Sequence, residues 1–273
     1  MKLNFLLFVL LFLSVGATAQ TTIIQISDTH LGEPRAPHAA ENLRRVVEMV
    51  NHRHPDAVVV TGDIGENPEQ WQQAKSILHG VKAKLYYIPG NHDVHSNDVD
   101  RYRRAFGDDY YRVRIKNVVL YAIDSELLGN FDVYTNKDLA ATRPSGLARQ
   151  EGERMLAWLE KQRAASNATI AIGMQHVPAY RDPRVLSDTK PYWVLNEPDR
   201  TREIEALKRL GIRHMLVGHW HHADVFDYGG ITWHVAPATS WLPWGGELGF
   251  AVHTITPDGN VKTDFIYLDH ATE

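Results

Sequence analysis

The stretch IIQISDTH, residues 23–30, contains the pattern that decides the fold, because an apolar run leads directly into side chains that can bind a metal ion. Its β-branched residues are bounded by turn residues, which predicts a short buried strand at residues 22–27. Four more runs have the same character, at residues 57–61, 84–89, 169–175 and 214–217. Segments with the apolar spacing of a helix face separate these runs. This alternation predicts a layered α/β fold.

The last third of the chain has the pattern of β-hairpins. Residues 225–236 contain a Gly-Gly turn at 229–230, and residues 249–268 are interrupted by the turn residues 257–260. We expect both hairpins to belong to a second, partly antiparallel sheet that packs on the first. No repeat, low-complexity tract or linker divides the sequence, so we predict a single domain over residues 20–273.

Each of the five predicted strands ends in polar side chains of kinds that coordinate metals. In chain order these are Asp28 and His30, then Asp63, then Asn91 with His92 and Asp93, then His176, and finally His219 with His221. Ligands bind at the carboxyl ends of the strands in an open α/β sheet, so we expect these side chains to converge. Gly62, Gly90 and Gly218 agree with this, since a residue without a Cβ lets the backbone turn sharply and approach an ion closely.

The donor atoms indicate which metals could bind. Asp, His and Asn offer only oxygen and nitrogen, which suits Mn, Fe, Zn or Co, and the chain contains no Cys. This set of donors is too large for one tetrahedral ion but suffices for two ions that share a bridging carboxylate. A lone histidine at a strand end is usually an ordinary surface or core residue, whereas five such strand ends favour a two-metal site. Two-metal sites clamp both oxygens of an in-line displacement and typically hydrolyse phosphate esters.

Taken together, these motifs resemble the full signature of the calcineurin-like metallophosphoesterase superfamily. The match covers about residues 23–221, and the motifs follow the order of the family: Asp28-x-His30, Gly62-Asp63, Gly90-Asn91-His92-Asp93, His176 and Gly218-His219-x-His221. The resemblance implies a four-layer αββα sandwich, an α/β fold in which two mixed β-sheets are flanked by helices. It also implies a metal-dependent phosphoesterase, a hydrolase that acts on ester bonds.

The resemblance further implies a role for each matching residue. Asp28, His30 and His221 would hold one metal ion, Asn91, His176 and His219 would hold the other, and Asp63 would bridge the two. His92 would act as a general acid on the leaving oxygen, and Asp93 would orient the His92 imidazole. The cofactors would be two divalent or mixed-valence ions, of which Mn, Fe or Zn are expected. The ions would lower the pKa of a water between them, so that a metal-bound hydroxide attacks a phosphomonoester or phosphodiester.

Two departures narrow the position of the chain within the superfamily. Purple acid phosphatases carry a tyrosine ligand three residues after the Gly-Asp aspartate, where this chain has Glu66, so we do not expect a purple Fe(III) enzyme. The segments 136–160 and 191–200 are loosely similar to a branch that includes protein serine/threonine phosphatases. Protein phosphatase activity is therefore one alternative. A non-catalytic metal- or phosphate-binding protein on the same scaffold is another, although a pure binding module needs no general acid.

Fewer features of the sequence indicate the substrate. A loop after the fourth strand carries Arg181 and Trp193, and a later stretch carries Trp241 and Trp244. These side chains could form two walls of a cleft for a nucleotide or another ring-bearing phosphate, because a base stacks on an aromatic ring. The alternative is that the aromatic rings cover a sheet edge and that the cation is solvated.

The first 19 residues have the pattern of a secretory signal peptide. Lys2 is followed by an apolar run at residues 5–15 and by the small residues Ala17, Thr18 and Ala19, which are typical of a cleavage site. The run is shorter than the roughly 20 residues that a spanning helix needs, which favours cleavage over a membrane anchor. We therefore expect export to a periplasm or the medium, with no stable membrane insertion after cleavage. Cytosolic cyclic nucleotides and phosphoproteins would then be out of reach.

The charge distribution limits the class of partner. The formal net charge is -4, and Lys and Arg are spread along the chain without a basic stripe, so we do not expect binding to a nucleic-acid duplex. The expected partner is a small phosphate ester or a phosphorylated macromolecule.

Overall fold

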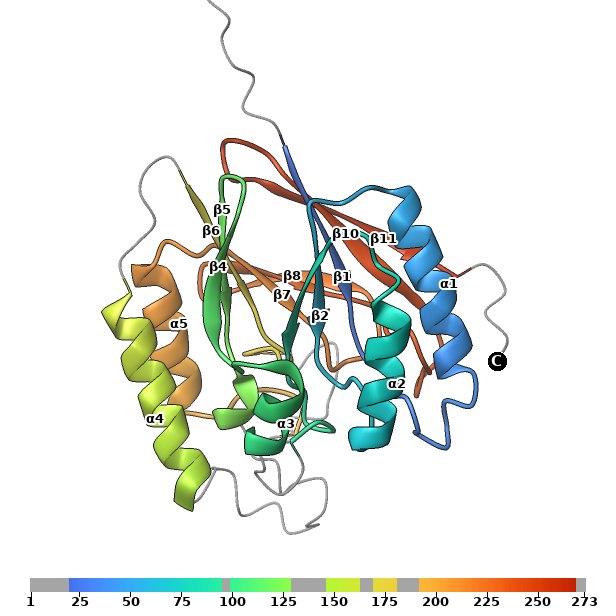
Figure 1. Ribbon diagram of the computed structural model, residues 1–273. Coiled ribbons are helices and arrows are strands. Elements are labelled where there is room, and N and C mark those ends of the chain that lie inside the picture. The colour runs from blue at the N-terminus through green and yellow to red at the C-terminus, as the bar shows by residue number, and fades with distance from the viewer. Residues whose placement is uncertain (1–19, 95–98, 129–145, 163–168, 181–191, 269–273) are drawn as a thin grey trace, which may run out of the picture.

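The computed structural model shows two mixed β-sheets that pack face to face between two layers of helices (Figure 1). The structure describes residues 20–94, 99–128, 146–162, 169–180 and 192–268. The predicted signal segment at residues 1–19 and Arg181 lie outside the described residues. The four-layer α/β sandwich expected from the sequence is confirmed.

The first sheet has the strand order β11-β10-β1-β2-β3. Its central strands β1 (Thr21–Ile26), β2 (Ala57–Thr61) and β3 (Lys84–Ile88) are parallel to one another. Strand β10 (Gly249–Ile255) pairs antiparallel with β1, and β11 (Val261–Tyr267) pairs antiparallel with β10. All five residues of β2 are buried, as is typical of a parallel strand that is covered on both faces.

The second sheet has the strand order β4-β5-β6-β7-β9-β8. Its strands are β4 (Tyr111–Ile115), β5 (Val118–Ala122), β6 (Ile170–Met174), β7 (His214–Val217), β8 (Asp224–Tyr228) and β9 (Ile231–Val235). Strands β5, β6, β7 and β9 are parallel, and β4 and β8 pair antiparallel at the two edges. In both sheets, the carboxyl ends of several parallel strands therefore lie at one edge of the sandwich.

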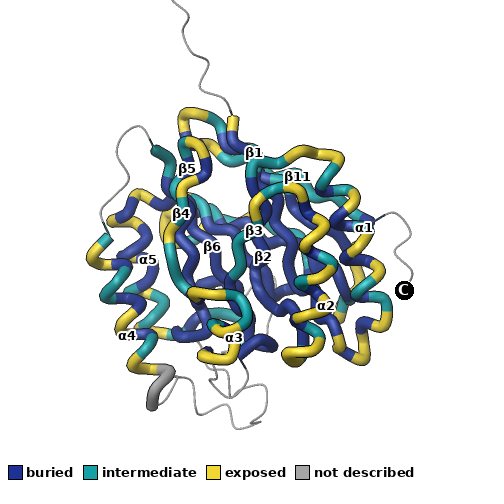
Figure 2. The backbone as a smooth tube through the Cα atoms, in the orientation of Figure 1, coloured by how far each residue is buried: buried dark blue, intermediate teal, exposed yellow. Residues whose placement is uncertain are grey.

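Helices cover the outer faces of the sandwich (Figures 1 and 2). Helices α1 (Ala39–His52) and α2 (Pro68–Leu78) lie on the first sheet, and α4 (Gly146–Lys161) and α5 (Asp199–Arg209) lie on the second. Two short helices, α3 (Val99–Phe106) and the 3₁₀ helix η2 (Ser125–Leu127), lie before and after the β4–β5 pair. The start of α2 is specified locally, because the Asn67 side chain accepts hydrogen bonds from the Glu69 and Gln70 amides and Pro68 is the first helical residue.

The expectation from the sequence was partly wrong for the two C-terminal hairpins. Both predicted hairpins form, as β8–β9 and β10–β11, but they do not share a second sheet. Each extends a different sheet, because β10 finds the free edge of β1 and β9 finds the free edge of β7. A third antiparallel pair, β4–β5, was not predicted, although residues 111–115 alternate in burial and the loop is only two residues long.

Among the described residues, no helix has the length and apolar character needed to cross a bilayer.

An apolar layer fills most of the space between the sheets. Its residues come from both sheets and are almost fully buried; they include Ile23, Val59, Ile88, Leu120, Ile172, Met174 and Leu216. This layer holds the two sheets together and so brings the ends of β1, β2 and β3 next to the ends of β6 and β7.

Candidate metal centre

The seven predicted metal ligands lie together at one edge of the sandwich. Asp28 and His30 follow β1, Asp63 follows β2, Asn91 follows β3, His176 follows β6, and His219 and His221 follow β7. All seven are buried, with exposed fractions between 0 and 7%. The structure therefore brings these seven residues together, as predicted.

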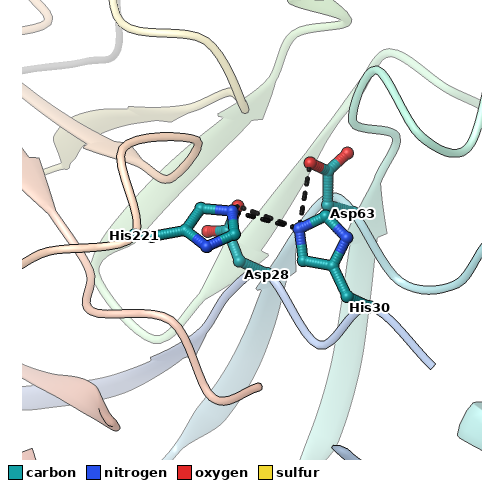
Figure 3. Close-up of side chains that lie close together, drawn as sticks. All are labelled: Asp28, His30, Asp63 and His221. Carbon is teal, nitrogen blue, oxygen red and sulfur yellow. Dashed lines mark hydrogen bonds and ion pairs between the residues drawn. The ribbon is translucent and has the colours of Figure 1, made fainter. Parts of the chain in front are cut away.

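Four of these side chains form a first group, which Figure 3 shows pointing toward one another. The His30 Nε2 atom lies 3.4 Å from Asp63 Oδ2 and 3.1 Å from His221 Nε2. The His221 Nε2 atom also lies 3.3 Å from Asp28 Oδ1. Two carboxylates and two imidazoles thus direct their donor atoms at one point.

A second group shares Asp63 with the first. The Asp63 Oδ2 atom lies 3.2 Å from His176 Nε2, and His176 Nε2 lies 3.2 Å from His219 Nδ1. Asn91 lies alongside, and its Nδ2 group donates to the Tyr192 hydroxyl at 3.4 Å. The Asp63 carboxylate therefore lies between the two groups, as expected of a bridging ligand.

The second nitrogen of each imidazole is held by an acceptor outside the cluster. His176 Nδ1 donates to the Thr61 carbonyl at 2.7 Å, His219 Nε2 to the Tyr192 carbonyl at 2.8 Å, and His221 Nδ1 to the Trp241 carbonyl at 3.0 Å. These bonds keep a proton on the outer nitrogen, so the nitrogen that faces the cluster is the one available to a metal ion. Each of these three rings is therefore oriented as a metal ligand requires.

The backbone of the cluster is strained. Among the described residues, seven non-glycine residues have a positive φ, and five of them are predicted ligands: Asp28, His30, Asp63, His219 and His221. L-residues seldom adopt this left-handed conformation, which costs of the order of 1–3 kcal/mol for each residue. Strain concentrated in this way is typical of functional sites.

Close backbone approach explains two of the motif glycines. A Cβ atom at Gly90 would overlap the carboxylate and the amide nitrogen of Asp63, and one at Gly218 would overlap the side chains of Ser27 and Asp28. The third, Gly62, has a φ of 85°. The glycines thus allow the ligand loops to pack against one another, as the sequence predicted.

The charges of the cluster favour a cation beside Asp63. Burial alone would raise the pKa of Asp63, but the imidazoles of His176, His92 and His30 hold it well below its ordinary value. Burial lowers the pKa of His176, yet the Asp63 carboxylate outweighs this and raises it to about 10. Burial lowers the pKa of His221 to about 4. One side of the cluster therefore attracts positive charge while other imidazoles stay neutral, which suits metal ligation.

The residues present fit a pair of divalent cations. The buried Asn91 Oδ1 atom has no hydrogen-bond partner, and the imidazole nitrogens of His30 and His221, and of His176 and His219, lie 3.1–3.2 Å apart. A bound cation would accept the lone pairs of both nitrogens in such a pair. The donors are oxygen and nitrogen only, which Mn, Fe and Zn accept.

The orientation of His92 differs from the expectation. Asp93 does not contact the imidazole, because its carboxylate accepts hydrogen bonds from the Ile64, Gly65 and Gly90 amides and from the Trp71 indole. The prediction that Asp93 orients His92 is therefore wrong. A local carboxylate next in sequence was a reasonable candidate, but the turn at residues 90–93 directs it back into its own loop.

Glu66 occupies the position that was assigned to Asp93. Its carboxylate lies 2.9 Å from His92 Nδ1 and 3.3 Å from His30 Nδ1. Burial alone would lower the pKa of His92, but the Asp63 and Glu66 carboxylates raise it to about 9. The sequence carried one signal for Glu66, its position three residues after Asp63, but only the structure shows the two imidazoles that it joins.

Aromatic side chains surround the cluster, and three of them are the predicted substrate contacts. The Trp241 ring lies 5.0 Å from that of His221, and the Trp193 ring lies 5.5 Å from that of His219. Trp244 packs edge-on against Trp193 at 5.0 Å and is 56% exposed. The two segments expected to contact substrate therefore touch each other through Trp193 and Trp244, beside His219.

These features define a class of protein, an αββα sandwich with a buried cluster of oxygen and nitrogen ligands at the carboxyl ends of its strands. A family model described as calcineurin-like phosphoesterase matches residues 21–223, and the chain belongs to this family. It is accordingly a hydrolase that acts on phosphate esters, and its fold implies divalent metal ions.

Relatives within the family carry several activities in their names. A "Probable cyclic nucleotide phosphodiesterase" from Rhodococcus erythropolis is 27% identical over 83% of this chain and 75% of its own length. The glycerophosphodiester phosphodiesterase GpdQ from Enterobacter lignolyticus is 29% identical over 71% of this chain and 66% of its own length. The solved structure of a dimetal phosphatase from Danio rerio superposes with a TM-score of 0.61 and 15% identity, covering 91% of this chain and 99% of that one. That last likeness concerns the fold alone.

Proposed function

We propose that this protein hydrolyses small, ring-bearing phosphate esters outside the cytosol, with two divalent cations held across Asp63. The observation that supports this most directly is the Asp63 carboxylate itself, which lies within 3.4 Å of His30 on one side and 3.2 Å of His176 on the other. The family contains both diesterases and phosphatases, so both phosphodiesters and phosphomonoesters belong in the test.

In this proposal, the seven ligands divide as the two groups do. Asp28, His30 and His221 hold one ion, Asn91, His176 and His219 hold the other, and Asp63 contacts both. When bound, the two cations activate a water molecule and offset the negative charge of the phosphoryl oxygens. The carbonyls that accept from the outer nitrogens of His176, His219 and His221 keep the rings aimed at the cations.

His92 is the proposed general acid. Its Nδ1 atom faces Glu66, so its Nε2 atom is the one that can deliver a proton to the leaving oxygen. The Asp63 and Glu66 carboxylates favour the protonated imidazole, as the raised pKa of about 9 indicates. Protonation of the leaving oxygen contributes most when that oxygen is a strongly basic alkoxide.

The aromatic side chains support a ring-bearing substrate. Trp193 and Trp244 form an edge-to-face pair beside His219, and Trp241 packs against His221. An exposed tryptophan at this position can stack on a nucleobase or an aryl group. Arg181, which lies outside the described residues, is proposed as a further contact on the sequence pattern alone.

Export is proposed on the pattern of the first 19 residues, with its apolar run and small-residue cleavage site. An exported enzyme meets nucleotides, sugar phosphates and lipid head groups outside the cytosol. Detection of the processed chain in a periplasmic or secreted fraction, starting near Gln20, would test this part. A full-length chain in the cytosolic fraction would contradict it.

The activity is tested with metal-free protein reconstituted with Mn²⁺. We expect turnover of p-nitrophenyl phosphate or of bis(p-nitrophenyl) phosphate, and we expect Asp63→Asn to abolish it, because one cation loses its shared ligand. Undiminished turnover by Asp63→Asn would contradict the proposal that this cluster is the active site. Two bound ions and tight phosphate binding, with no turnover of a broad panel of phosphate esters, would instead favour a non-catalytic binding protein.

The aromatic contacts are tested separately. Trp244→Ala should raise KM for a nucleoside phosphate ester and leave KM for glycerol phosphate esters unchanged, since only the former can stack. An equal change for both substrates would rule out the stacking role. Trp158→Ala is a suitable control, because Trp158 is a partly buried indole on α4 that packs against Tyr110.

A further inference from the structure

A chain of buried and partly buried polar side chains crosses the space between the two sheets. His214 Nδ1 lies 3.1 Å from His234 Nε2, and His234 Nδ1 lies 2.8 Å from Thr263 Oγ1. The Thr263 hydroxyl lies 2.9 Å from His253 Nδ1, and His253 Nε2 lies 3.0 Å from Gln25 Oε1. Gln25 and His253 are fully buried, and His234 is 2% exposed. The chain crosses from one sheet to the other between His234 and Thr263, since His214 and His234 belong to one sheet and the other three residues to the other.

Gln25 is the end of this chain nearest the metal centre. Its Nε2 group donates to Thr61 Oγ1 at 2.8 Å and to the Val217 carbonyl at 2.9 Å. Thr61 is in β2 of the same sheet, whereas Val217 is in β7 of the other sheet. One amide group therefore joins three strands across the sandwich.

These three strands lead into three of the five ligand loops. Asp28 comes three residues after Gln25, Asp63 comes two residues after Thr61, and His219 comes two residues after Val217. Each group of the metal centre also combines residues from both sheets, such as Asp28 with His221. The spacing between the sheets at Gln25 therefore sets the distance between ligands that must share one ion.

The hydrogen bonds of the chain run in one direction. Because the Gln25 Nε2 group donates to a carbonyl, its Oε1 atom must accept, and His253 must carry its proton on Nε2. His253 Nδ1 then accepts from the Thr263 hydroxyl, which accepts from His234 Nδ1. The orientation of the Gln25 amide is therefore fixed from both sides, by the Val217 carbonyl and by the Nε2–H group of His253.

This arrangement is not what stability alone would favour. Buried polar groups are costly when unpaired and, at best, nearly neutral when paired, so an aliphatic side chain would serve the core at least as well. A fully paired network does specify a single register. Ile23, two residues earlier on the same face of β1, is the kind of buried aliphatic residue that is usual at such a position.

We propose that Gln25 is a positioning residue of the metal centre, which holds the ligand loops of the two sheets at the spacing that two cations require and is itself oriented by His253. This inference rests on the metal site proposed above. Gln25 acts through the strands and contacts neither the cations nor the substrate.

The histidines of the chain are held neutral, as its one-way hydrogen bonding requires. Burial lowers the pKa of His253 well below its ordinary value and that of His234 to about 4, and each is further lowered by its neighbouring histidines. Burial and the Arg213 cation lower the pKa of His214, against an opposing effect of Asp227.

The test is the affinity of the metal-free protein for Mn²⁺, measured by calorimetry or by the EPR signal of free Mn²⁺. Gln25→Met keeps the volume and removes all three hydrogen bonds, and we expect binding to weaken about 10-fold, as for other residues that orient metal ligands. Ile23→Ala is the matched control, because it removes buried atoms from the same strand face without touching the network. It should lower the thermal stability and leave the Mn²⁺ affinity unchanged.

A second variant covers the case in which Gln25→Met does not fold. Thr61→Val is nearly isosteric and removes only one of the two acceptors of Gln25, so we expect a several-fold loss of affinity. Wild-type affinity in either folded variant would overturn the inference. The proposed function fails in a different way, if the wild-type protein does not bind two Mn²⁺ ions or if Asp63→Asn binds them as well as the wild type.

Discussion

The edge of the sandwich that carries the ligands and the apolar layer behind it lie between the same two sheets, yet they are built in opposite ways. At the edge, five ligands adopt left-handed backbone conformations and buried carboxylates face imidazoles. Behind it, Ile23, Val59 and Ile172 lie fully buried in regular strands. The strain of the edge is offset by the packing of the layer, so substitutions should separate function from stability.

After the loss of Asp63, the largest expected effect is that of His92, a residue of the ligand-bearing edge. We expect His92→Ala to lower kcat by about 10²–10⁴-fold, more for an alkyl ester than for a p-nitrophenyl ester, because an alkoxide depends more on protonation. Steady-state kinetics with both esters measure this. His52→Ala, at an exposed histidine at the end of α1, should retain wild-type kcat. An equal loss for both esters would argue against the general-acid role.

A pair of alanine substitutions tests the comparison directly. Gly90→Ala introduces a Cβ that overlaps Asp63, and we expect a loss of about 100-fold in kcat/KM from the displaced ligand. Ile172→Ala leaves a cavity in the apolar layer and should lower the free energy of unfolding by about 3 kcal/mol. Ile172→Ala should keep the Mn²⁺ affinity of the wild type. The separation would break down if Ile172→Ala weakened Mn²⁺ binding as much as Gly90→Ala does.

Acid should weaken the polar chain that links the two regions. The pKa of His234 is about 4 in the folded protein and about 6.5 when unfolded, so only the unfolded chain takes up this proton as the pH falls below about 6.5. The stabilisation is therefore complete above pH 6.5 and is lost progressively toward pH 4. At pH 5 this histidine should cost about 2 kcal/mol.

Urea unfolding of the metal-free protein at pH 7 and pH 5 measures this effect, with His234→Gln as the comparison because it removes the titrating ring. The decrease in the free energy of unfolding should be smaller in the variant by about the contribution of His234. Equal decreases in the two proteins would show that His234 does not couple stability to pH.

The smallest expected effect is that of Glu66, which contacts two imidazoles of the edge without being a proposed ligand. Glu66→Gln keeps the shape but cannot accept equally from His30 and His92, so we expect kcat to fall about 10-fold. Glu69→Gln makes the same chemical change on the exposed start of α2 and should have no effect. An unchanged kcat in Glu66→Gln would show that Glu66 is not needed to orient His92 and that the loop of His92 is sufficient.

Much of the fold and most of the candidate site could be predicted from local pattern. The strands before Asp28, Asp63 and His176 were recognisable because buried β-branched runs and turn residues act over a few positions. The ligand residues were recognisable because donor chemistry depends on residue type. The glycines could be anticipated for the same reason, since only glycine tolerates the close contact between Gly90 and Asp63.

The remainder depended on contacts between distant segments. The sequence could not show that Glu66 rather than Asp93 faces His92, or that the two C-terminal hairpins extend different sheets. It also could not show that His234 and His253 form a chain that ends at Gln25.

What the sequence by itself determined was which residues carry metal-binding chemistry and that each follows a strand, because these properties are local. What only the tertiary structure decided was which partner each side chain finds. The reason is that sheet-edge pairing and buried hydrogen bonds are selected by the packing of the whole sandwich, and no short stretch of sequence contains that information.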